Sequence, residues 1–184
     1  MNIADVLHVL ENTTEANESA IIEVQAFLAD INFEVDKLHA INMLLKVNNV
    51  PEIDNLLKRE LILLLNNYPC DIKKPYIFIS YSSKDWKYVY PHVIKMKFQG
   101  INVWIDIELE NHSGEKWNTT VKQVLMKHQL KMMIFFMSKN AFTSGPIFQE
   151  LLFSQKDKFA GGPNKNFTPY LIPINIIENF DANL

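Results

Sequence analysis

The sequence predicts an α/β protein, in which a parallel sheet with flanking helices follows a small all-α helical bundle. Three observations predict this class. From Tyr76 onward, short apolar runs typical of buried strands alternate with segments typical of helices. Residues 1–70 carry apolar positions at helical spacing. Between the two regions, Tyr68 to Pro75 contains two prolines, which stop helix and strand alike. We therefore expect two domains, residues 1–70 and residues 71–184.

Composition narrows the class of protein. The chain has 184 residues, 48% of them hydrophobic and 21% charged, as in ordinary globular proteins. No apolar run approaches the roughly 20 residues of a membrane span, and Met1 to Asp5 lacks the basic start of a signal peptide. The lone Cys70 excludes an internal disulfide and a multi-cysteine metal site. We expect a cytoplasmic protein with no membrane contact and no metal.

The net charge of -3 hides an asymmetry between the two regions. Residues 1–70 hold four Lys/Arg against eleven Asp/Glu, whereas residues 71–184 hold fourteen against ten. Either the two halves attract one another, or neighbouring copies stack head to tail, or the acidic half is merely a solvated helical surface. Nucleic acid is not an expected partner, because Arg59 is the only arginine and arginine makes most bidentate phosphate and guanine contacts.

The first region is predicted to form four helices, the last of which begins at Pro51. The second and third helices are either separate or continuous, since only Asn32 and Phe33 interrupt the pattern between them. Leu61 to Leu65 is apolar all round, which predicts burial on more than one side. The four apolar faces comprise Ile3, Val6, Leu7 and Leu10; Ile21, Val24, Phe27, Leu28 and Ile31; Val35, Leu38, Ile41, Leu44 and Leu45; and Ile53, Leu56, Leu57 and Leu61.

A bundle of about 70 residues is marginally stable by itself. Packing on the second domain or on another copy would stabilise it, so residues 1–70 are interpreted as an oligomerisation or docking domain. His8 and His39 are isolated in the sequence and are expected to be surface or packed residues.

The second region opens with the strand Tyr76 to Ile79 and the polar loop Ser80 to Asp85. A helix from Trp86 to Phe98 follows, and Gln99-Gly100 is a signal for its end. In an open α/β sheet, ligands bind beyond the carboxyl ends of the strands, where loop amides and helix N-termini point at them. The loop after this first strand is therefore the expected place of function.

Three more strands are predicted, at Ile101 to Asp106, Met132 to Met137 and Tyr170 to Ile176. Helices are expected from Trp117 and from Ile147 to Lys158. Four β/α repeats with short connections imply a parallel sheet with right-handed crossovers.

At this point the residues resemble a family, the TIR (Toll/interleukin-1 receptor) domain of the sort common in bacterial proteins, which has a flavodoxin-like sheet. The resemblance covers Tyr76 to Leu152; each motif is weak alone, and their order along the predicted elements makes the match specific. The matching motifs are Ile77-Phe78-Ile79-Ser80-Tyr81-Ser82 with Asp85; Gly100-Ile101-Asn102-Val103-Trp104-Ile105-Asp106; Gly114-Glu115-Lys116-Trp117; the strand ending in Ser138; and Ser144 followed by Glu150-Leu151.

The resemblance implies one of two functions. TIR domains either cleave NAD+ at the nicotinamide–ribose bond, releasing nicotinamide and ADP-ribose or a cyclic form, or act as adaptors that assemble with one another. In the enzymes a glutamate in the helix after the third strand is catalytic, and that position falls on Glu150. A carboxylate beside a developing ribosyl cation suits this chemistry. From the residues alone, Glu150 faces either the cleft or solvent.

By the same resemblance, Ser80, Tyr81 and Ser82 line the substrate cleft, with Ser144 also on the substrate side. Loop amides and hydroxyls can bind a dinucleotide without a metal, so NAD+ is expected as substrate and no cofactor is required. Asp106 either orders the loop that follows it or contacts the ribose. Trp104 and Trp117 are interpreted as packing residues. The loop Ile107 to Lys116 is implied as the assembly and gating segment, through Glu108, Glu110, His112, Gly114 and Trp117.

Two departures from the family pattern bear on activity. Active TIR enzymes often carry an aromatic residue four positions before the glutamate, and here Pro146 occupies that place. Family members usually continue through a further helix, a fifth strand and a final helix, whereas this chain ends at Leu184, as a shortened domain or part of a longer protein. The edge of the sheet would then need covering, by residues 1–70 or by another copy.

The sequence thus predicts an NAD+ glycohydrolase activated by self-association, in the manner of bacterial antiphage defence effectors. The alternative is a non-catalytic signalling adaptor that makes homotypic TIR contacts. The helical domain is expected to promote self-association or to dock on a sensor or effector protein.

Overall fold

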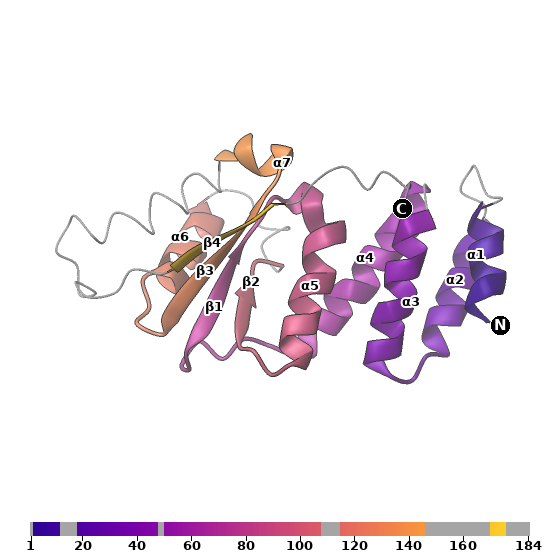
Figure 1. The fold of residues 1–184 in the computed structure, drawn as a ribbon, viewed down its shortest axis with the longest axis horizontal. Helices are drawn as coiled ribbons and strands as arrows, with labels where there is room; N and C mark the ends of the chain where they lie inside the picture. The colour runs from indigo at the N-terminus through magenta and orange to yellow at the C-terminus, as the bar shows by residue number, and fades with distance from the viewer. Residues whose placement is uncertain (1, 12–17, 48–49, 108–114, 146–169, 176–184) are drawn as a thin grey trace. The chain divides into compact units, whose positions relative to one another are not determined.

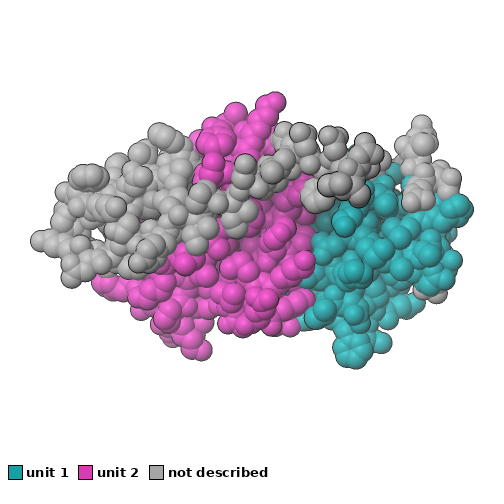
Figure 2. Space-filling view, in the orientation of Figure 1, with its two compact units in different colours: residues 1–67 teal, residues 68–184 magenta. Residues whose placement is uncertain are grey.

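The computed structural model describes residues 2–11, 18–47, 50–107, 115–145 and 170–175. The chain divides into two compact units, residues 1–67 and residues 68–184, which we call the helical unit and the sheet unit. Figure 1 shows the elements of each unit, and Figure 2 colours the two units separately. Among the described helices, none has both the length and the apolar character that crossing a bilayer requires.

The helical unit consists of α1 (Ile3–Glu11), α2 (Glu18–Ala29), α3 (Glu34–Val47) and α4 (Pro51–Asn66). As predicted, Pro51 occupies the first turn of α4, where a missing N–H costs no hydrogen bond. The turn between Ala29 and Glu34 separates α2 from α3, so the two helices are not continuous. The core that joins the four helices includes Val6, Val24, Ile41, Leu44, Ile53, Leu57 and Leu61.

Two predicted core positions of this unit are exposed. Val35, assigned to the apolar face of the third helix, keeps 64% of its surface accessible. Leu63, in the run expected to be buried on more than one side, keeps 57%. Both predictions were wrong because a helix has 3.6 residues per turn, and the core contacts only one stripe of it. An apolar residue outside that stripe stays in solvent, whatever its neighbours in sequence.

Among the described residues of the sheet unit, four parallel strands lie in the order β2-β1-β3-β4. They are β1 (Tyr76–Ser80), β2 (Val103–Ile105), β3 (Leu130–Met137) and β4 (Tyr170–Asn175). The registers pair Ile77 with Val103, Tyr76 with Leu130 and Met132 with Tyr170. With the preceding helical bundle, this arrangement confirms the predicted fold class, an α/β parallel sheet with flanking helices.

The described parts of the connections contain the short 3-10 helix η1 (Ser83–Asp85), α5 (Trp86–Phe98), α6 (Glu115–Leu125) and α7 (Lys139–Phe142). Helices flank the sheet on both faces, with α5 on one side and α6 on the other (Figure 1). Helix α6 and the sheet share one hydrophobic core. Its residues are Val121, Val124 and Leu125 of α6 and Tyr76, Phe78, Leu130 and Met133 of β1 and β3.

Aromatic residues organise that core. Phe78 and Trp104 stack across the two neighbouring strands, with ring centroids 4.8 Å apart. The buried hydroxyl of Tyr76 donates a 2.5 Å hydrogen bond to the carbonyl of Val124 at the end of α6. Trp104 is therefore a packing residue, as predicted.

The end of α5 follows its sequence signal. Gly100 has a positive φ of 77°, which a residue with a Cβ adopts only at a cost. The amide of Gly100 donates to Lys97 O and that of Ile101 to Met96 O, the two bonds of a Schellman motif. This turn aims the chain into β2.

Some boundaries differ from those predicted. β2 is shorter than Ile101 to Asp106, and β3 begins two residues before Met132. Glu115 and Lys116 belong to α6 and not to the preceding loop. The helix predicted from Ile147 to Lys158 lies outside the described residues.

Candidate functional site

The carboxyl ends of β1, β2 and β3 meet at one edge of the sheet, which we call the carboxyl edge. Ile79 pairs with Ile105 on one side, and Ser80 pairs with Phe135 on the other. The polar segments that follow these three strands therefore begin next to one another, although the sequence separates them by tens of residues. They contain the candidate site residues of the loop after β1, Asp106 and Ser144.

A buried carboxylate joins two of these segments. Asp85, at the end of η1, is only 4% exposed. It accepts hydrogen bonds from the hydroxyl of Ser138, which directly follows β3, and from Nδ2 of Asn140 at 2.7 Å. The Ser138 hydroxyl also accepts a 2.9 Å bond from the amide of Ala141, and so caps α7. Asp85 thus fastens the loop after β1 to the end of β3.

Tyr81 joins the same loop to the end of β2. Its hydroxyl donates a 2.8 Å hydrogen bond to the backbone carbonyl of Asp106. It also lies 3.1 Å from the hydroxyl of the buried Tyr90 on α5, and the two rings meet edge to face. The hydroxyl of Tyr81 therefore serves as a structural contact in this state, while its side chain is only half-buried.

Two serines of the loop, Ser80 and Ser82, are buried, whereas Ser83 is exposed. Ser80 is 1% exposed at the end of β1, and Ser82 is 7% exposed just before η1. The carbonyl of Ser82 accepts a 2.8 Å bond from the amide of Asp85. Ser144 is half-buried, and its amide donates to Ala141 O at 3.1 Å just past α7. The exposed Ser83 and the half-buried Tyr81 are therefore more accessible to a ligand at this edge than Ser80 and Ser82.

Most of the other predicted site residues fall outside the part of the chain that the structure describes. Glu150, Glu108, Glu110, His112 and Gly114 all lie outside the described residues. Trp117 is the third residue of α6, which begins at Glu115 and not at Trp117. The structure therefore brings together Ser80, Tyr81, Ser82 and Asp106, with Ser144 on the segment that follows β3.

The carboxyl edge offers hydroxyls and backbone amides, and the exposed Lys84 and Lys139 lie on the segments that follow β1 and β3. Hydroxyls and backbone amides can bind the sugar and phosphate oxygens of a nucleotide. Among the described residues, no group of three or more His, Cys, Asp or Glu is arranged to hold a metal ion. The buried carboxylate of Asp85 is already engaged by two donors, which suits a role in positioning the loop.

Asp85, Ser138 and Asn140 were not predicted as site residues. A signal for them exists in the sequence, because Ser138 directly follows a fully apolar strand and Asp85 directly precedes a helix. Polar residues at such strand ends meet at the carboxyl edge of a parallel sheet. Their pairing, however, spans 53 residues, and no local pattern predicts it.

A second buried ionisable group lies at the segment that leads into β1. Lys97 on α5 is 7% exposed, and its ammonium donates to the carbonyls of Tyr68 at 2.6 Å and Val103 at 2.9 Å. Burial lowers the pKa of Lys97. Burial also raises the pKa of the half-buried Cys70 thiol to about 11, a rise that the nearby Lys97 charge reduces. Sequence reasoning missed Lys97, because a lysine in a helix usually faces solvent.

The comparisons with known proteins bear on the sheet unit. The model of a family described as a TIR domain matches residues 77–182. That range is more than half of the chain, and it contains the loop after β1, Asp106, Ser144 and Glu150. A search of curated proteins finds no match for this chain.

Proposed function

This chain belongs to the TIR domain family, and on that premise we propose that it is an NAD+ glycohydrolase that becomes active on self-association. The substrate is NAD+, and the bond that breaks joins nicotinamide to the ribose. The products are nicotinamide and ADP-ribose or its cyclic form. TIR domains act as NAD+ hydrolases or as adaptors, and the catalytic proposal is the one that gives Glu150 a chemical role.

The proposed catalytic residue is Glu150. As the nicotinamide leaves with the bonding electron pair, positive charge develops on the ribosyl carbon, and a nearby carboxylate stabilises that charge. Water then attacks the same carbon and gives up a proton, which completes hydrolysis to ADP-ribose. In the cyclic alternative, a nitrogen of the adenine ring takes the place of water. No metal is needed, since nicotinamide leaves as a neutral molecule.

The observation that carries the proposal is the polar carboxyl edge within a TIR fold. Hydroxyl-bearing residues follow β1 and β3 at this edge, and the bonds of Tyr81 to the end of β2 and of Asp85 to the end of β3 hold the loop after β1. A preorganised loop of this kind suits a dinucleotide, because its amides and hydroxyls need little rearrangement on binding. We propose Ser80, Tyr81, Ser82, Asp106 and Ser144 as substrate-binding residues.

Regulation is proposed to come from assembly. In this proposal the helical unit promotes self-association, and the segment with Glu108, Glu110, His112, Gly114 and Trp117 contacts a neighbouring copy and opens the site. Depletion of NAD+ by such an assembly is a means of abortive defence, and we propose bacterial antiphage defence as its setting. A sensor or effector protein that binds the helical unit would then supply the activating signal.

The decisive experiment measures nicotinamide release from NAD+ by the full chain at high protein concentration. Glu150→Ala should lower the rate at least about a hundredfold, since a positioned catalytic group contributes about that much or more. Glu150→Gln is the matched control, because it keeps the shape of the side chain without its charge and should be equally impaired. Absence of nicotinamide from the assembled wild-type chain would refute the proposal.

One observation favours the alternative, a non-catalytic adaptor. Pro146 stands where active relatives often carry an aromatic residue that helps enclose nicotinamide. If the chain is an adaptor, Gly114→Val should abolish binding between copies, whereas Glu150→Ala should change nothing. Restoring an aromatic residue with Pro146→Phe distinguishes the two: it should raise NAD+ cleavage in a weak enzyme and leave an adaptor inactive.

A further inference from the structure

The helical unit exposes apolar side chains at one corner. Phe33 lies in the turn between α2 and α3 with 73% of its surface accessible, and Val35, the second residue of α3, has 64% accessible. Leu63 on α4 keeps 57%. Large apolar side chains at this level of exposure mark an interaction surface when they gather around a hollow.

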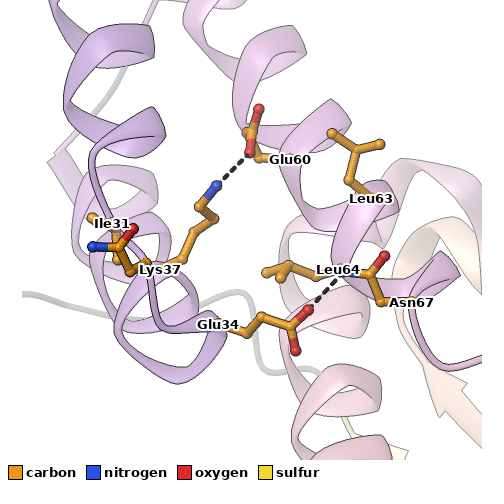
Figure 3. Close-up of a pocket in the computed structure, with 8 residues that line it drawn as sticks. Ile31, Glu34, Lys37, Glu60, Leu63, Leu64 and Asn67 are labelled. Carbon is orange, nitrogen blue, oxygen red and sulfur yellow. Dashed lines mark hydrogen bonds and ion pairs between the residues drawn. The ribbon is translucent and has the colours of Figure 1, made fainter.

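A hollow of this unit has Leu63 in its lining, together with Asn32 and Glu34, the sequence neighbours of Phe33. A pocket of about 260 Å³ is formed between the α2–α3 turn and α4 (Figure 3). Its wall contains the ion pair between Lys37 and Glu60, at 3.4 Å, and the 2.6 Å hydrogen bond from Asn67 to Glu34. Its lining residues are Ile31, Asn32, Glu34, Lys37, Glu60, Leu63, Leu64 and Asn67.

The charge around the pocket is predominantly negative. Asp30 and Asp36 are exposed on either side of Phe33, and Glu34 lies at the pocket wall. The positive charge of Lys37, at the start of α3, is paired with the carboxylate of Glu60 on α4. We call the set Asp30, Phe33, Glu34, Val35 and Asp36, with the pocket, the acidic corner. It offers a protruding aromatic ring, a hollow and an excess of carboxylates.

A surface of opposite charge, with exposed lysines and an exposed methionine, lies on the sheet unit at the amino ends of β1 and β3. These ends are adjacent, because Tyr76 pairs with Leu130 and the amide of Tyr76 donates to Gln129 O at 3.0 Å. Exposed Lys73 and Lys74 precede β1, and exposed Lys131 begins β3. The turn before β3 adds Lys127, His128 and the 43% exposed Met126. Asp71 contributes a carboxylate to the segment before β1, where it pairs with Lys74, and the lysines of the two segments outnumber it.

We propose that the acidic corner of one copy docks on this lysine-rich edge of a second copy. Phe33 and Val35 are exposed, so both side chains are available for contact with a second copy. The lysine-rich edge matches the corner in charge, and Met126 offers an apolar side chain for Phe33 to contact. Apolar contact at the centre with complementary charges around it is the usual anatomy of a specific interface.

The contact is heterologous, because the two surfaces come from different parts of the chain. Two copies that exchange corners form a closed dimer, whereas copies that each give to one neighbour and receive from another form a ring or filament. The proposal rests on the self-association within the proposed function and not on NAD+ cleavage. The experiment therefore measures molecular mass in solution. A failure of the docking proposal can then be distinguished from a failure of the enzyme proposal.

The test uses charge reversal in the full chain, measured by sedimentation velocity over a wide range of protein concentration. One variant, Asp30→Lys/Asp36→Lys, makes the corner basic, and a second, Lys127→Glu/Lys131→Glu, makes the edge acidic. Each alone should associate at least about tenfold more weakly than wild type, since like charges then face each other. An equimolar mixture of the two should regain association, because each reversed surface finds its complement on the other variant.

Matched controls separate this contact from general effects of charge and apolar exposure. Lys95→Glu/Lys122→Glu makes the same charge change on exposed positions of α5 and α6 and should associate like wild type. Phe33→Ser should weaken association about tenfold, whereas Phe142→Ser, which removes a 71% exposed ring from α7, should not. Raising salt from about 0.1 M to about 1 M should weaken the wild-type assembly, because the Debye length falls from about 10 Å to about 3 Å.

Three outcomes overturn the proposal. They are a wild-type chain that stays monomeric at every concentration, reversed variants that associate as wild type does, and two monomeric variants whose mixture stays monomeric. Circular dichroism of each variant verifies that the fold persists, which is expected because all the changed side chains except the half-buried Lys127 are exposed.

Discussion

Asp85 shows how one side chain can hold a functional loop. Its carboxylate is buried and accepts two hydrogen bonds from residues beyond the end of β3. Hydrogen bonds to a charged group contribute more than neutral ones, and buried donors left without a partner carry a desolvation cost. The position of Ser80, Tyr81 and Ser82 therefore depends on a residue that need not touch the substrate.

Replacing this carboxylate should destabilise the chain measurably. Asp85→Ala leaves Ser138 and Asn140 without their acceptor, and the free energy of unfolding should fall by about 3 kcal/mol. Asp85→Asn should cost less, because an amide oxygen can still accept one bond. The exposed neighbour Lys84 is the control, and Lys84→Ala should stay within about 0.5 kcal/mol of wild type in urea unfolding. Equal stabilities of the alanine variants would contradict this role.

Cys70 predicts a pH dependence of stability. Burial raises the pKa of its thiol from 9.0 to about 11 in the folded chain. Above pH 9.0 the unfolded thiol loses its proton first, so the unfolded state binds fewer protons and stability falls as pH rises towards about 11. Below this interval both states keep the proton, and the group has no effect on the pH dependence.

The variant Cys70→Ala isolates that contribution. Between about pH 8 and about pH 11 it should lose less stability than wild type, by an amount on the order of 1 kcal/mol after allowance for solvent screening of a half-exposed group. Urea unfolding of both proteins at the two pH values measures the difference. Burial is the larger cause of the raised pKa of Tyr76 and of the lowered pKa of Lys97 and acts in both proteins, whereas the smaller effect of the Cys70 charge on these two groups is part of the measured difference. Parallel pH profiles would contradict the assignment.

At the scale of the elements, α5 is fixed at its carboxyl end by two devices. The Schellman turn at Gly100 ends the helix, and the buried ammonium of Lys97 bonds to the carbonyls of Tyr68 and Val103. The second device connects α5 to the start of β2 and to the segment that precedes β1. A buried lysine persists here because each carbonyl provides an acceptor that offsets part of its desolvation.

Lys97→Met should therefore destabilise the sheet unit by about 2 kcal/mol. The methionine replaces the apolar stem of the lysine, but it leaves two carbonyls without their donor. Lys95→Met, on an exposed position of the same helix, is the matched control and should change stability by less than about 0.5 kcal/mol. Thermal or urea unfolding provides the measurement, and a Lys97→Met chain as stable as its control would show that these bonds contribute little.

At the scale of the whole molecule, the two units have opposite charge. Residues 1–70 have eleven acidic residues against four basic ones, whereas residues 71–184 have an excess of basic residues. In the proposed docking between copies, this opposite charge makes association sensitive to salt. In the proposed function, this association controls the catalytic site.

An enzyme activated by assembly has a specific activity that rises with its own concentration. Nicotinamide production should therefore increase more steeply than linearly with protein concentration. Adding Glu150→Ala chains to dilute wild type should raise the activity of each wild-type chain, because they supply partners without active sites. Adding the same amount of an unrelated acidic protein should have no effect. Strictly linear activity would contradict activation by assembly.

Much of the fold could be predicted because its signals are local. Apolar spacing in residues 1–70 and the apolar runs of β1 and β3 follow from which residues a helix or strand exposes to a core. The prolines and Gly100 mark ends of elements through their own backbone preferences. The motifs of the sheet unit also resembled the family whose model matches residues 77–182.

The sequence by itself determined the α/β class, the helical region before the sheet, and the family. Only the tertiary structure decided that Asp85 meets Ser138 and Asn140, that Lys97 is buried, and that Val35 and Leu63 remain exposed. The physical reason is range: backbone preference and periodicity act between near neighbours in sequence. Burial and hydrogen-bond partners depend instead on which distant segments pack together.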